Sequence, residues 1–330
     1  MKSKKLITAV VAVATMALVA STGTAARAAD KTLNIQMVSK GFQHQFWQAV
    51  KLGSVNAGKA LNANITFVGP ESESMVDKQL EQLQAAIDAK PDAIGYASLD
   101  PKAPLATLAK AKTAGIPVYE FDASAGTEAD LGIASSIAMG IARTDGVAAS
   151  ALAADKMAAA IGGKGKVFVI SHSQVNATGI QRRDGFLQEM KKKFPKVTVL
   201  PVQYGDGDHT KSADIVKAVI AANKDLKGVF ATNEGGAIGA VDAFSELKLA
   251  KGKIKLIGFD SGAGQINAIK SGLMLGAITQ DPIGIGYKTV AALVAYVRNK
   301  TVPAKFIDTG FYFYDKKNLT DPKIAAVLYQ

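Results

Sequence analysis

Four hydrogen-bonding side chains each stand directly after a short apolar run of the sequence. They are Asp122 after 118–121, Asn233 after 229–232, Asp260 after 256–259 and Gln280 after 277–279. Asp and Asn are common helix N-caps and turn formers, which is enough to explain any one of them taken alone. Four at the same kind of position favour a shared site, because carboxylates and amides can bond several hydroxyl groups at once. We therefore predict a site for a polyhydroxylated molecule.

A second group of polar and aromatic residues, Gly-Phe-Gln-His-Gln-Phe-Trp at 41–47, follows the first apolar run. An aromatic face can stack on the apolar side of a sugar ring and leave its edges to polar groups. Phe46 and Trp47 are also candidates for a helix core. Because adjacent helical positions point about 100° apart, one could be core and the other ligand-facing. We favour Trp47 slightly, keep both, and interpret His44 as a neutral partner of a ligand hydroxyl.

Arg182 begins a further motif, Arg-Arg-Asp-Gly-Phe at 182–186, which follows an apolar run and a polar loop. The guanidinium of one of the two arginines, Arg182 or Arg183, could reach the same crevice as the strand-end residues. The alternative is a surface ion pair with Asp184 or Glu189. Both interpretations stay open from the residues alone.

The residue types and their spacing offer little support for a metal site or a catalytic site. Three histidines and no cysteine argue against a zinc site. The oxygen-rich segment 205–209 lacks the remaining ligands of a calcium loop, which favours a turn. We find no nucleophile elbow and no convincing pair of poised carboxylates. We therefore predict a protein that is not an enzyme and has no cofactor and no metal.

Short apolar runs alternate with amphipathic patterns along the chain, which predicts parallel sheets covered by helices. Strands are predicted at 33–39, 64–68, 93–97, 118–121, 166–171, 197–202, 228–232, 254–259 and 275–279. Helices are predicted at 46–61, 75–89, 104–114, 138–161, 180–193, 210–223, 237–247 and 283–300. This number of strands favours two sheets, with a seam near 135/136. Ligands of such sheets bind beyond the carboxyl ends of the strands, where the four polar side chains stand.

The first 28 residues have the order of a secretory signal peptide. Lys2, Lys4 and Lys5 precede an apolar run, and the segment ends in Ala26-Arg27-Ala28, an A-x-A cleavage signal. The absence of cysteine excludes disulfides and a lipid anchor on a cysteine. We expect export with cleavage after Ala28 and retention in a periplasm. The net charge is +11, from 39 basic and 28 acidic residues, but scattered lysines indicate a solvated surface rather than a nucleic-acid interface.

The chain resembles the ribose-binding protein family of periplasmic solute-binding proteins. The resemblance covers the mature chain and rests on the motifs 38–39 with 46–47, 115–118 with 121–122, 182–186, 230–234 and 258–260. The related lac-repressor type of regulator carries a helix-turn-helix at its start. A signal peptide in that place argues against this branch.

The resemblance implies an α/β fold of periplasmic binding protein type I, with two Rossmann-like lobes that have parallel sheets and are joined by a three-strand hinge. It places the N-terminal lobe at 29–135 plus 281–309 and the C-terminal lobe at 136–280 plus 310–330. It implies a ligand site in the cleft that closes about the hinge. The site residues carried over are His44, Phe46, Trp47, Asp122, Arg182, Asn233, Asp260 and Gln280.

Three positions depart from the ribose-binding pattern. Ala123 replaces an arginine, Ala97 replaces an asparagine and Gly207 replaces an aromatic residue. These changes put ribose itself in doubt and leave a different pentose, a hexose or a polyol open as ligand. Asn176 or His172 could supply replacement contacts.

The function implied is that of the binding component of an ABC importer, which captures a sugar or polyol and passes it to a membrane permease. The alternative is a sensory binding protein that presents a sugar-like ligand to a chemoreceptor or sensor kinase. We expect a monomer and no nucleic-acid partner.

Overall fold

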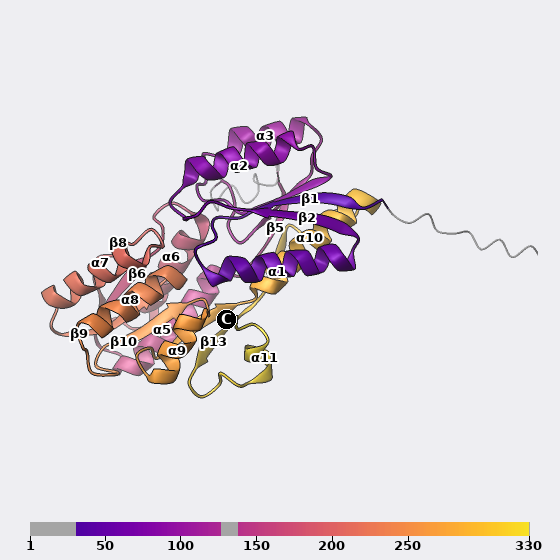
Figure 1. The fold of residues 1–330 in the computed structure, drawn as a ribbon. Helices are drawn as coiled ribbons and strands as arrows, with labels where there is room; N and C mark the ends of the chain where they lie inside the picture. The colour runs from indigo at the N-terminus through magenta and orange to yellow at the C-terminus, as the bar shows by residue number, and fades with distance from the viewer. Residues whose placement is uncertain (1–30, 127–137, 330) are drawn as a thin grey trace, which may run out of the picture. The chain divides into compact units, whose positions relative to one another are not determined.

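The computed structural model describes residues 31–126 and 138–329. The predicted signal peptide and the predicted seam at 135/136 lie outside these residues. Within them the strands form two separate sheets, each covered by helices (Figure 1). No helix in the described ranges has the length and apolar character needed to cross a bilayer.

The first sheet has six strands, and every neighbouring pair is parallel. Their order is β12 (Phe306–Asp308), β5 (Ala138–Arg143), β4 (Val118–Phe121), β3 (Ala93–Tyr96), β1 (Leu33–Val38) and β2 (Ala63–Val68). One face is covered by α1 (Gln45–Ala60) and α10 (Pro282–Asn299), the other by α2 (Val76–Asp88) and α3 (Leu105–Thr113). We call these elements the first lobe.

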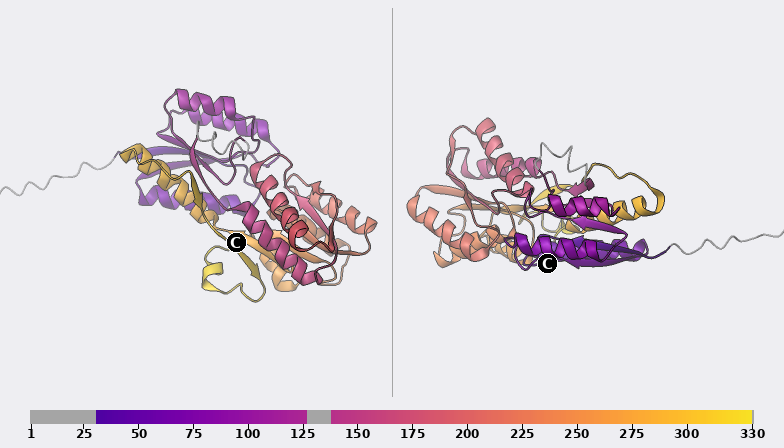
Figure 2. Two further views of the ribbon diagram at one scale, coloured as in Figure 1. Left: turned by 180° about the vertical axis from the view of Figure 1, so that it is seen from behind. Right: turned by 90° about the horizontal axis from the view of Figure 1, so that it is seen from above.

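The second sheet has seven strands, of which only β13 runs antiparallel to its neighbour. Their order is β13 (Phe311–Asp315), β11 (Gly276–Gln280), β10 (Lys255–Phe259), β9 (Leu226–Ala231), β6 (Gly165–Ser171) and β7 (Val197–Val199), with β8 (Gln203–Tyr204) also paired to β6. Its helices are α5 (Gly146–Ile161) and α6 (Ala177–Lys193) on one face, α7 (His209–Ala222), α8 (Glu234–Glu246) and α9 (Ala263–Ser271) on the other, and the short α11 (Pro322–Ala325). We call these elements the second lobe (Figure 2).

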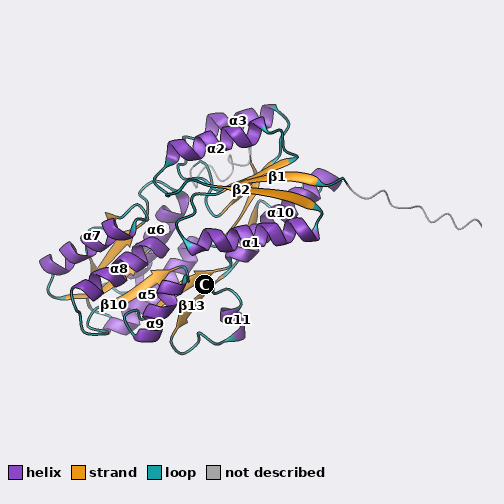
Figure 3. Cartoon of the chain, in the orientation of Figure 1, coloured by secondary structure: helices purple, strands orange, loops and turns teal. Residues whose placement is uncertain are grey.

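Burial explains why the strand-like runs of the sequence are apolar throughout rather than alternating. Every residue of β3, β4 and β11 is buried, because helices cover both faces of each sheet (Figure 3). In the second lobe the rings of Phe186 and Phe230 stack between α6 and β9 with centroids 4.5 Å apart. These two-sided cores hold the strand ends, and hence the polar residues that follow them, in fixed positions.

The described chain passes between the lobes three times: from β5 to α5, from β11 to α10 and from β12 to β13. Two of these connections are bonded to each other. The Thr309 amide donates to the Arg143 carbonyl at 3.1 Å, and the Thr144 hydroxyl donates to the Gly310 carbonyl at 3.2 Å. This arrangement confirms the predicted fold class of two α/β lobes joined by three segments.

One predicted element is wrong. The segment 138–161 forms not a single helix but β5 followed by α5, because the backbone of 138–143 pairs with β4 and β12. The helix then starts where Asp145 caps it by accepting a hydrogen bond from the Ala148 amide at 3.0 Å. Since β5 belongs to the first sheet, the first crossing lies after Arg143, later than the predicted 135/136. The other two crossings lie between Gln280 and Pro282 and between Asp308 and Phe311.

Candidate functional site

Asp122 and Asp260 occupy equivalent places in the two lobes. Asp122 follows β4 and Asp260 follows β10, and each donates its backbone amide to the neighbouring strand, to the Ala142 carbonyl at 3.0 Å and the Ile278 carbonyl at 2.6 Å. Both adopt left-handed backbone, with φ of 58° and 79°. This conformation is uncommon outside glycine and best tolerated by Asp and Asn. It turns each aspartate out of its strand at the edge where the lobes meet.

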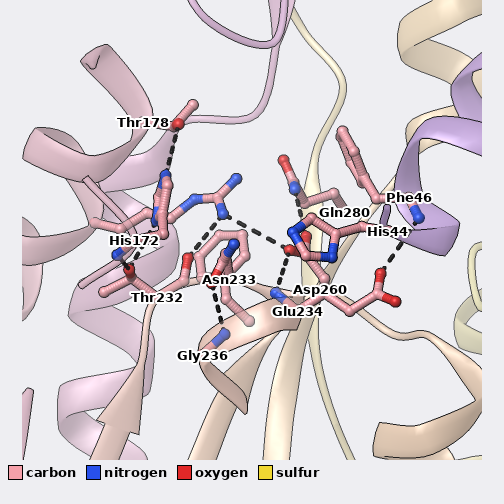
Figure 4. Close-up of polar contacts among 12 residues, drawn as sticks. His44, Phe46, His172, Thr178, Thr232, Asn233, Glu234, Gly236, Asp260 and Gln280 are labelled. Atoms are coloured by element: carbon pink, nitrogen blue, oxygen red, sulfur yellow. Dashed lines mark hydrogen bonds and ion pairs between the residues drawn. The ribbon is translucent and has the colours of Figure 1, made fainter. Parts of the chain in front are cut away.

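The second lobe holds Asp260 in a network of its own. One carboxylate oxygen accepts from the Gln280 side chain at 2.7 Å and the other from the Glu234 amide at 3.0 Å (Figure 4). Burial raises the pKa of Asp260, while the nearby Arg182 charge and the Gln280 bond act in the opposite direction. The predicted residues Asp260 and Gln280 therefore come together as one unit.

Arg182, from α6, lies between the two aspartates. Its Nη atoms are 4.0 Å from an Asp122 oxygen and 3.8 Å from an Asp260 oxygen. The guanidinium also donates to the Thr232 carbonyl at 2.8 Å and lies 3.7 Å from the centroid of the Phe259 ring. Arg182 is 4% exposed and makes no surface ion pair with any described residue, whereas Arg183 makes the pair with Asp184 that was considered from the sequence.

A second buried cation, Lys40, was missed by the sequence analysis. Its ammonium group is 2.9 Å from Asp122 and donates to the Thr178 hydroxyl of the second lobe at 3.2 Å. Thr178 also contacts one ring nitrogen of His172, and Thr232 contacts the other, at 3.1 and 2.8 Å. Lys40 therefore places a positive charge beside Asp122. The ribose-binding pattern has an arginine next to this aspartate, where this chain has Ala123. His172, which we considered as a replacement contact, has both nitrogens engaged.

Asn233 and His44 both stand at helix starts, and each has a buried polar atom without a hydrogen-bond partner in the described part of the chain. The Asn233 side-chain oxygen caps α8 by accepting from the Gly236 amide at 2.9 Å. Among the described residues, the buried polar atoms without a hydrogen-bond partner include Asn233 Nδ2, His44 Nδ1 and Arg182 Nε. Capping and ligand binding are thus compatible at Asn233. Burial lowers the pKa of His44 to about 4, in keeping with the neutral ring predicted from the sequence.

The two aromatic candidates differ in their surroundings. Trp47 is 1% exposed, donates its indole N–H to Glu73 at 2.8 Å and packs edge-on against Phe121. The rings of Phe46 and Trp47 pack edge to face with centroids 4.9 Å apart. Figure 4 shows Phe46 beside His44 and Gln280. Both belong to the core of the first lobe, and the backbone amide of Phe46 donates to Glu234 of the second lobe at 3.3 Å.

Two glutamates complete the charges and were also missed. Burial acts to raise the pKa of Glu73, but Lys40, His44 and the indole N–H of Trp47 lower it below its usual value. Burial, together with the charge of Asp260, raises the pKa of Glu234 to about 7. Glu234 directly follows Asn233 at a strand end, so its position in the sequence was a usable signal. Glu73 lies in the loop before α2, where no pattern marks it.

The structure also places the three positions that depart from the ribose-binding pattern. Ala97 and Ala123 are fully buried, and Gly207 has φ of 71° in a turn next to Asn233 and His44. Asn176, the other replacement contact we considered, caps α6 by accepting from the Gly179 amide at 2.7 Å. The described residues contain no group of three or more histidines and acidic residues placed to hold a metal ion.

Comparison with known proteins decides the family. Residues 35–301 match the model of the periplasmic binding protein domain. The chain belongs to this family. A solute-binding protein of an ABC transporter from Agrobacterium vitis, solved with D-fucose, is 33% identical, covers 90% of this chain over its whole length and superimposes with a TM-score of 0.84. A second from the same organism, bound to α-D-tagatopyranose, is 33% identical with 91% coverage and a TM-score of 0.85.

The ribose import binding protein of Salmonella typhimurium is 28% identical over 93% of this chain and 97% of its own length. These relatives confirm the predicted class, a periplasmic binding protein of the kind that serves ABC transporters for sugars. They place this chain in a family of binding proteins rather than enzymes. The relatives are periplasmic in type, in line with the predicted compartment.

Proposed function

We propose that this periplasmic binding protein captures a monosaccharide or related polyol between its two lobes and delivers it to the permease of an ABC importer. The ligand residues proposed are those predicted from the sequence, His44, Phe46, Trp47, Asp122, Arg182, Asn233, Asp260 and Gln280, joined by Lys40. The protein binds without turnover, as a soluble component in the periplasm after removal of residues 1–28.

The observation that supports this proposal is the convergence of charged and amide groups from both lobes. Asp122 and Lys40 come from the first lobe, while Arg182, Asn233 and Asp260 come from the second. All five are at most 4% exposed. Carboxylates accept from hydroxyl groups and the cationic and amide groups donate to them, so that one polyhydroxylated molecule could satisfy both walls.

The charges also indicate a neutral ligand. The two cations Lys40 and Arg182 are matched by Asp122 and Asp260, and the Glu73 charge is adjacent. A sugar acid would add a further buried anion without a free cation to pair with it, and burying an unpaired charge is costly. Neutral pentoses, hexoses and polyols fit this balance.

A thermal-shift screen tests the proposal. Pentoses, hexoses and polyols, beginning with D-fucose and D-tagatose, are added singly at millimolar concentration, with the matching sugar acids as controls. A ligand at 100 times its Kd stabilises the bound form by about 2.7 kcal/mol, which raises the melting temperature by several degrees. A shift with at least one neutral monosaccharide supports the proposal. No shift with any of them would contradict it.

A further inference from the structure

Glu234 reaches across from the second lobe to the start of α1 in the first. Its two carboxylate oxygens accept hydrogen bonds from the backbone amides of Gln45 and Phe46, at 3.2 and 3.3 Å. Figure 4 shows the bond from Phe46. These amides are among the first of the helix and have no acceptor within it. Glu234 therefore acts as the cap of a helix that belongs to the other lobe.

Helix α1 has no cap of its own. Its N-cap residue, His44, makes no side-chain cap bond, and its first turn contains no acidic residue. Several other helices supply their own cap: Asp145 for α5, Asn176 for α6, Asp208 for α7, Asn233 for α8 and Asp281 for α10. The start of α1 is thus completed only when the second lobe lies against it.

The exchange is reciprocal. The side-chain oxygen of Gln45 accepts from the Ala263 amide at 2.6 Å, at the start of α9 in the second lobe. Each lobe therefore supplies an acceptor to a helix start of the other. A third contact stands alongside, in which the Gln43 side chain donates to the Gly207 carbonyl at 3.3 Å.

Glycines make room for this contact. A side-chain carbon at Gly235 would lie 1.9 Å from the Gly207 carbonyl oxygen and 2.9 Å from the His44 ring. One at Gly262 would lie 2.8 Å from oxygens of both Gln45 and Glu234. The Gly235 contact with Gly207 and the Gly262 contact with Glu234 lie within the second lobe, whereas the contacts with His44 and Gln45 lie across the two lobes. Neither glycine has positive φ, so the lack of space for a side-chain carbon is what favours glycine at both positions.

We propose that Glu234 and Gln45 form a reciprocal latch that sets the balance between the open and closed forms and thereby the retention of the sugar. The inference rests on the proposed function but concerns positioning residues, which act through closure rather than through contact with the ligand. Since the latch contacts exist only in the closed form, their free energy adds to closure alone. Apparent affinity scales with the fraction of closed molecules, so the loss of the latch raises Kd while the binding groups stay intact.

Variants separate the latch from the binding groups. Glu234→Ala removes both acceptor oxygens, and we expect Kd for the sugar found in the screen to rise about tenfold, mainly through faster release. Gln45→Ala, on the other lobe, should raise Kd about threefold to tenfold. Glu234→Gln keeps one acceptor oxygen and should stay within about threefold of the wild type. Asp242→Ala removes an exposed carboxylate from the same helix and should change nothing.

The melting temperature of the sugar-free protein should be unchanged in all four variants, because the open form lacks the latch. Equal Kd values for Glu234→Ala, Gln45→Ala and the wild type would overturn the latch. A lower melting temperature of sugar-free Glu234→Ala or Gln45→Ala would also overturn it, because the loss of affinity would then follow from a destabilised fold. Failure of the wild type itself to bind any sugar would instead count against the proposed function.

A measurement without sugar tests the latch independently. The chain has no cysteine, so cysteines introduced at Leu52 on α1 and at Leu247 after α8 are the sole attachment points for spin labels. Both positions are exposed, one in each lobe. Electron–electron distance measurement should show a smaller short-distance population in Glu234→Ala than in the parent, with Asp242→Ala matching the parent. Identical distance distributions in sugar-free Glu234→Ala and the sugar-free parent would contradict the latch.

Discussion

The two lobes contribute to the candidate site in different ways. The polar groups of the second lobe are bonded mainly within that lobe: Gln280 to Asp260, Arg182 to the Thr232 carbonyl and to the face of Phe259, and Asn233 to the start of α8. Those of the first lobe reach outward. Lys40 donates to Thr178 across the gap, and the ring of His44 stacks against His209 at 5.8 Å.

The difference indicates an order of events. A wall whose side chains are fixed by their own lobe is ready to receive a ligand while the lobes are apart, because little ordering remains to be done on binding. A wall whose side chains bond across the gap is completed only on closure. We therefore infer that the sugar first docks on the second lobe and that the first lobe then closes over it.

Removal of the Arg182 charge should have the largest effect. Arg182→Met keeps an apolar stem over Phe259 but removes the guanidinium that lies between Asp122 and Asp260. Leaving buried carboxylates without their cation costs several kcal/mol, so we expect at least a hundredfold weaker binding in calorimetric titration. The adjacent Arg183→Met, which removes a surface pair with Asp184, is the control and should stay within twofold. Similar losses in both variants would contradict the central place of Arg182.

The two aspartates should separate affinity from stability. Asp122→Ala and Asp260→Ala should each weaken binding by about tenfold to several hundredfold, because each removes charged hydrogen-bond acceptors. Only Asp260→Ala should also clearly lower the melting temperature of the sugar-free protein, since Asp260 accepts two bonds within its own lobe. Unchanged affinity with a lowered melting temperature in both variants would mean that the aspartates are structural alone.

Two groups at the interface of the lobes should make closure respond to pH in opposite directions. Burial lowers the pKa of His44 from 6.5 to about 4. The charge of Glu73 opposes this shift, and the charges of His209 and Lys40 add to it. If opening returns the ring to water, closure releases a proton, and binding weakens as the pH falls from 6.5 towards 4.

Glu234 works the other way. Burial, together with the charges of Asp260 and Glu73, raises its pKa from 4.5 to about 7, although the Gln45 and Phe46 amides oppose this. Closure then takes up a proton, and binding weakens as the pH rises from 4.5 to 7. Asp260, whose pKa burial also raises, acts in the same direction. The buried phenols of Tyr314 and Tyr329, whose pKa values lie well above 10, stay neutral throughout.

In the wild type the two effects offset each other, and affinity should be nearly flat between about pH 6.5 and about pH 5.5. In Glu234→Gln the titration of His44 dominates. The Kd of this variant should therefore rise by about threefold to tenfold as the pH falls from about 6.5 to about 5.5. His44→Gln should show the reverse slope. Titration calorimetry at several pH values measures both. Slopes of the same sign in the two variants would contradict the assignment.

Trp47 should have the smallest effect on affinity. Trp47→Phe keeps a ring against Phe121 but loses the bond to Glu73, so we expect a loss of about 1 kcal/mol in the free energy of unfolding. Sugar affinity should stay within about threefold, whereas Phe46→Ala should weaken it more. A larger affinity loss for Trp47→Phe would make Trp47 the stacking residue that we favoured from the sequence.

The sequence was most informative where one local pattern determines one element. β4 has the predicted bounds, and Asp122 follows it as predicted, because a run buried on both faces is apolar throughout. The helix predicted over 138–161 failed because pairing with β4 and β12 overrides the local preference of 138–143. Strand β12 was missed for the same reason, since its pairing partner β5 is distant in the sequence. Strand β13 was also missed, although its partner β11 lies nearer in the chain.

The site was predictable where residues follow strands. Asp122, Asn233, Asp260 and Gln280 all stand at the cluster. Lys40 and Glu73 could not be found in this way, because they belong to loops and acquire their roles from residues that the fold brings close.

Closure of the lobes over the ligand can be measured by small-angle X-ray scattering of the wild-type protein. The protein is measured with and without a saturating amount of the sugar that gives the largest thermal shift. The sugar-free protein should contain open molecules, and the sugar should convert them to the closed arrangement in which Lys40 meets Thr178 and Glu234 meets α1. Closure should give a smaller radius of gyration with sugar. An unchanged radius of gyration at saturation would contradict closure over the ligand.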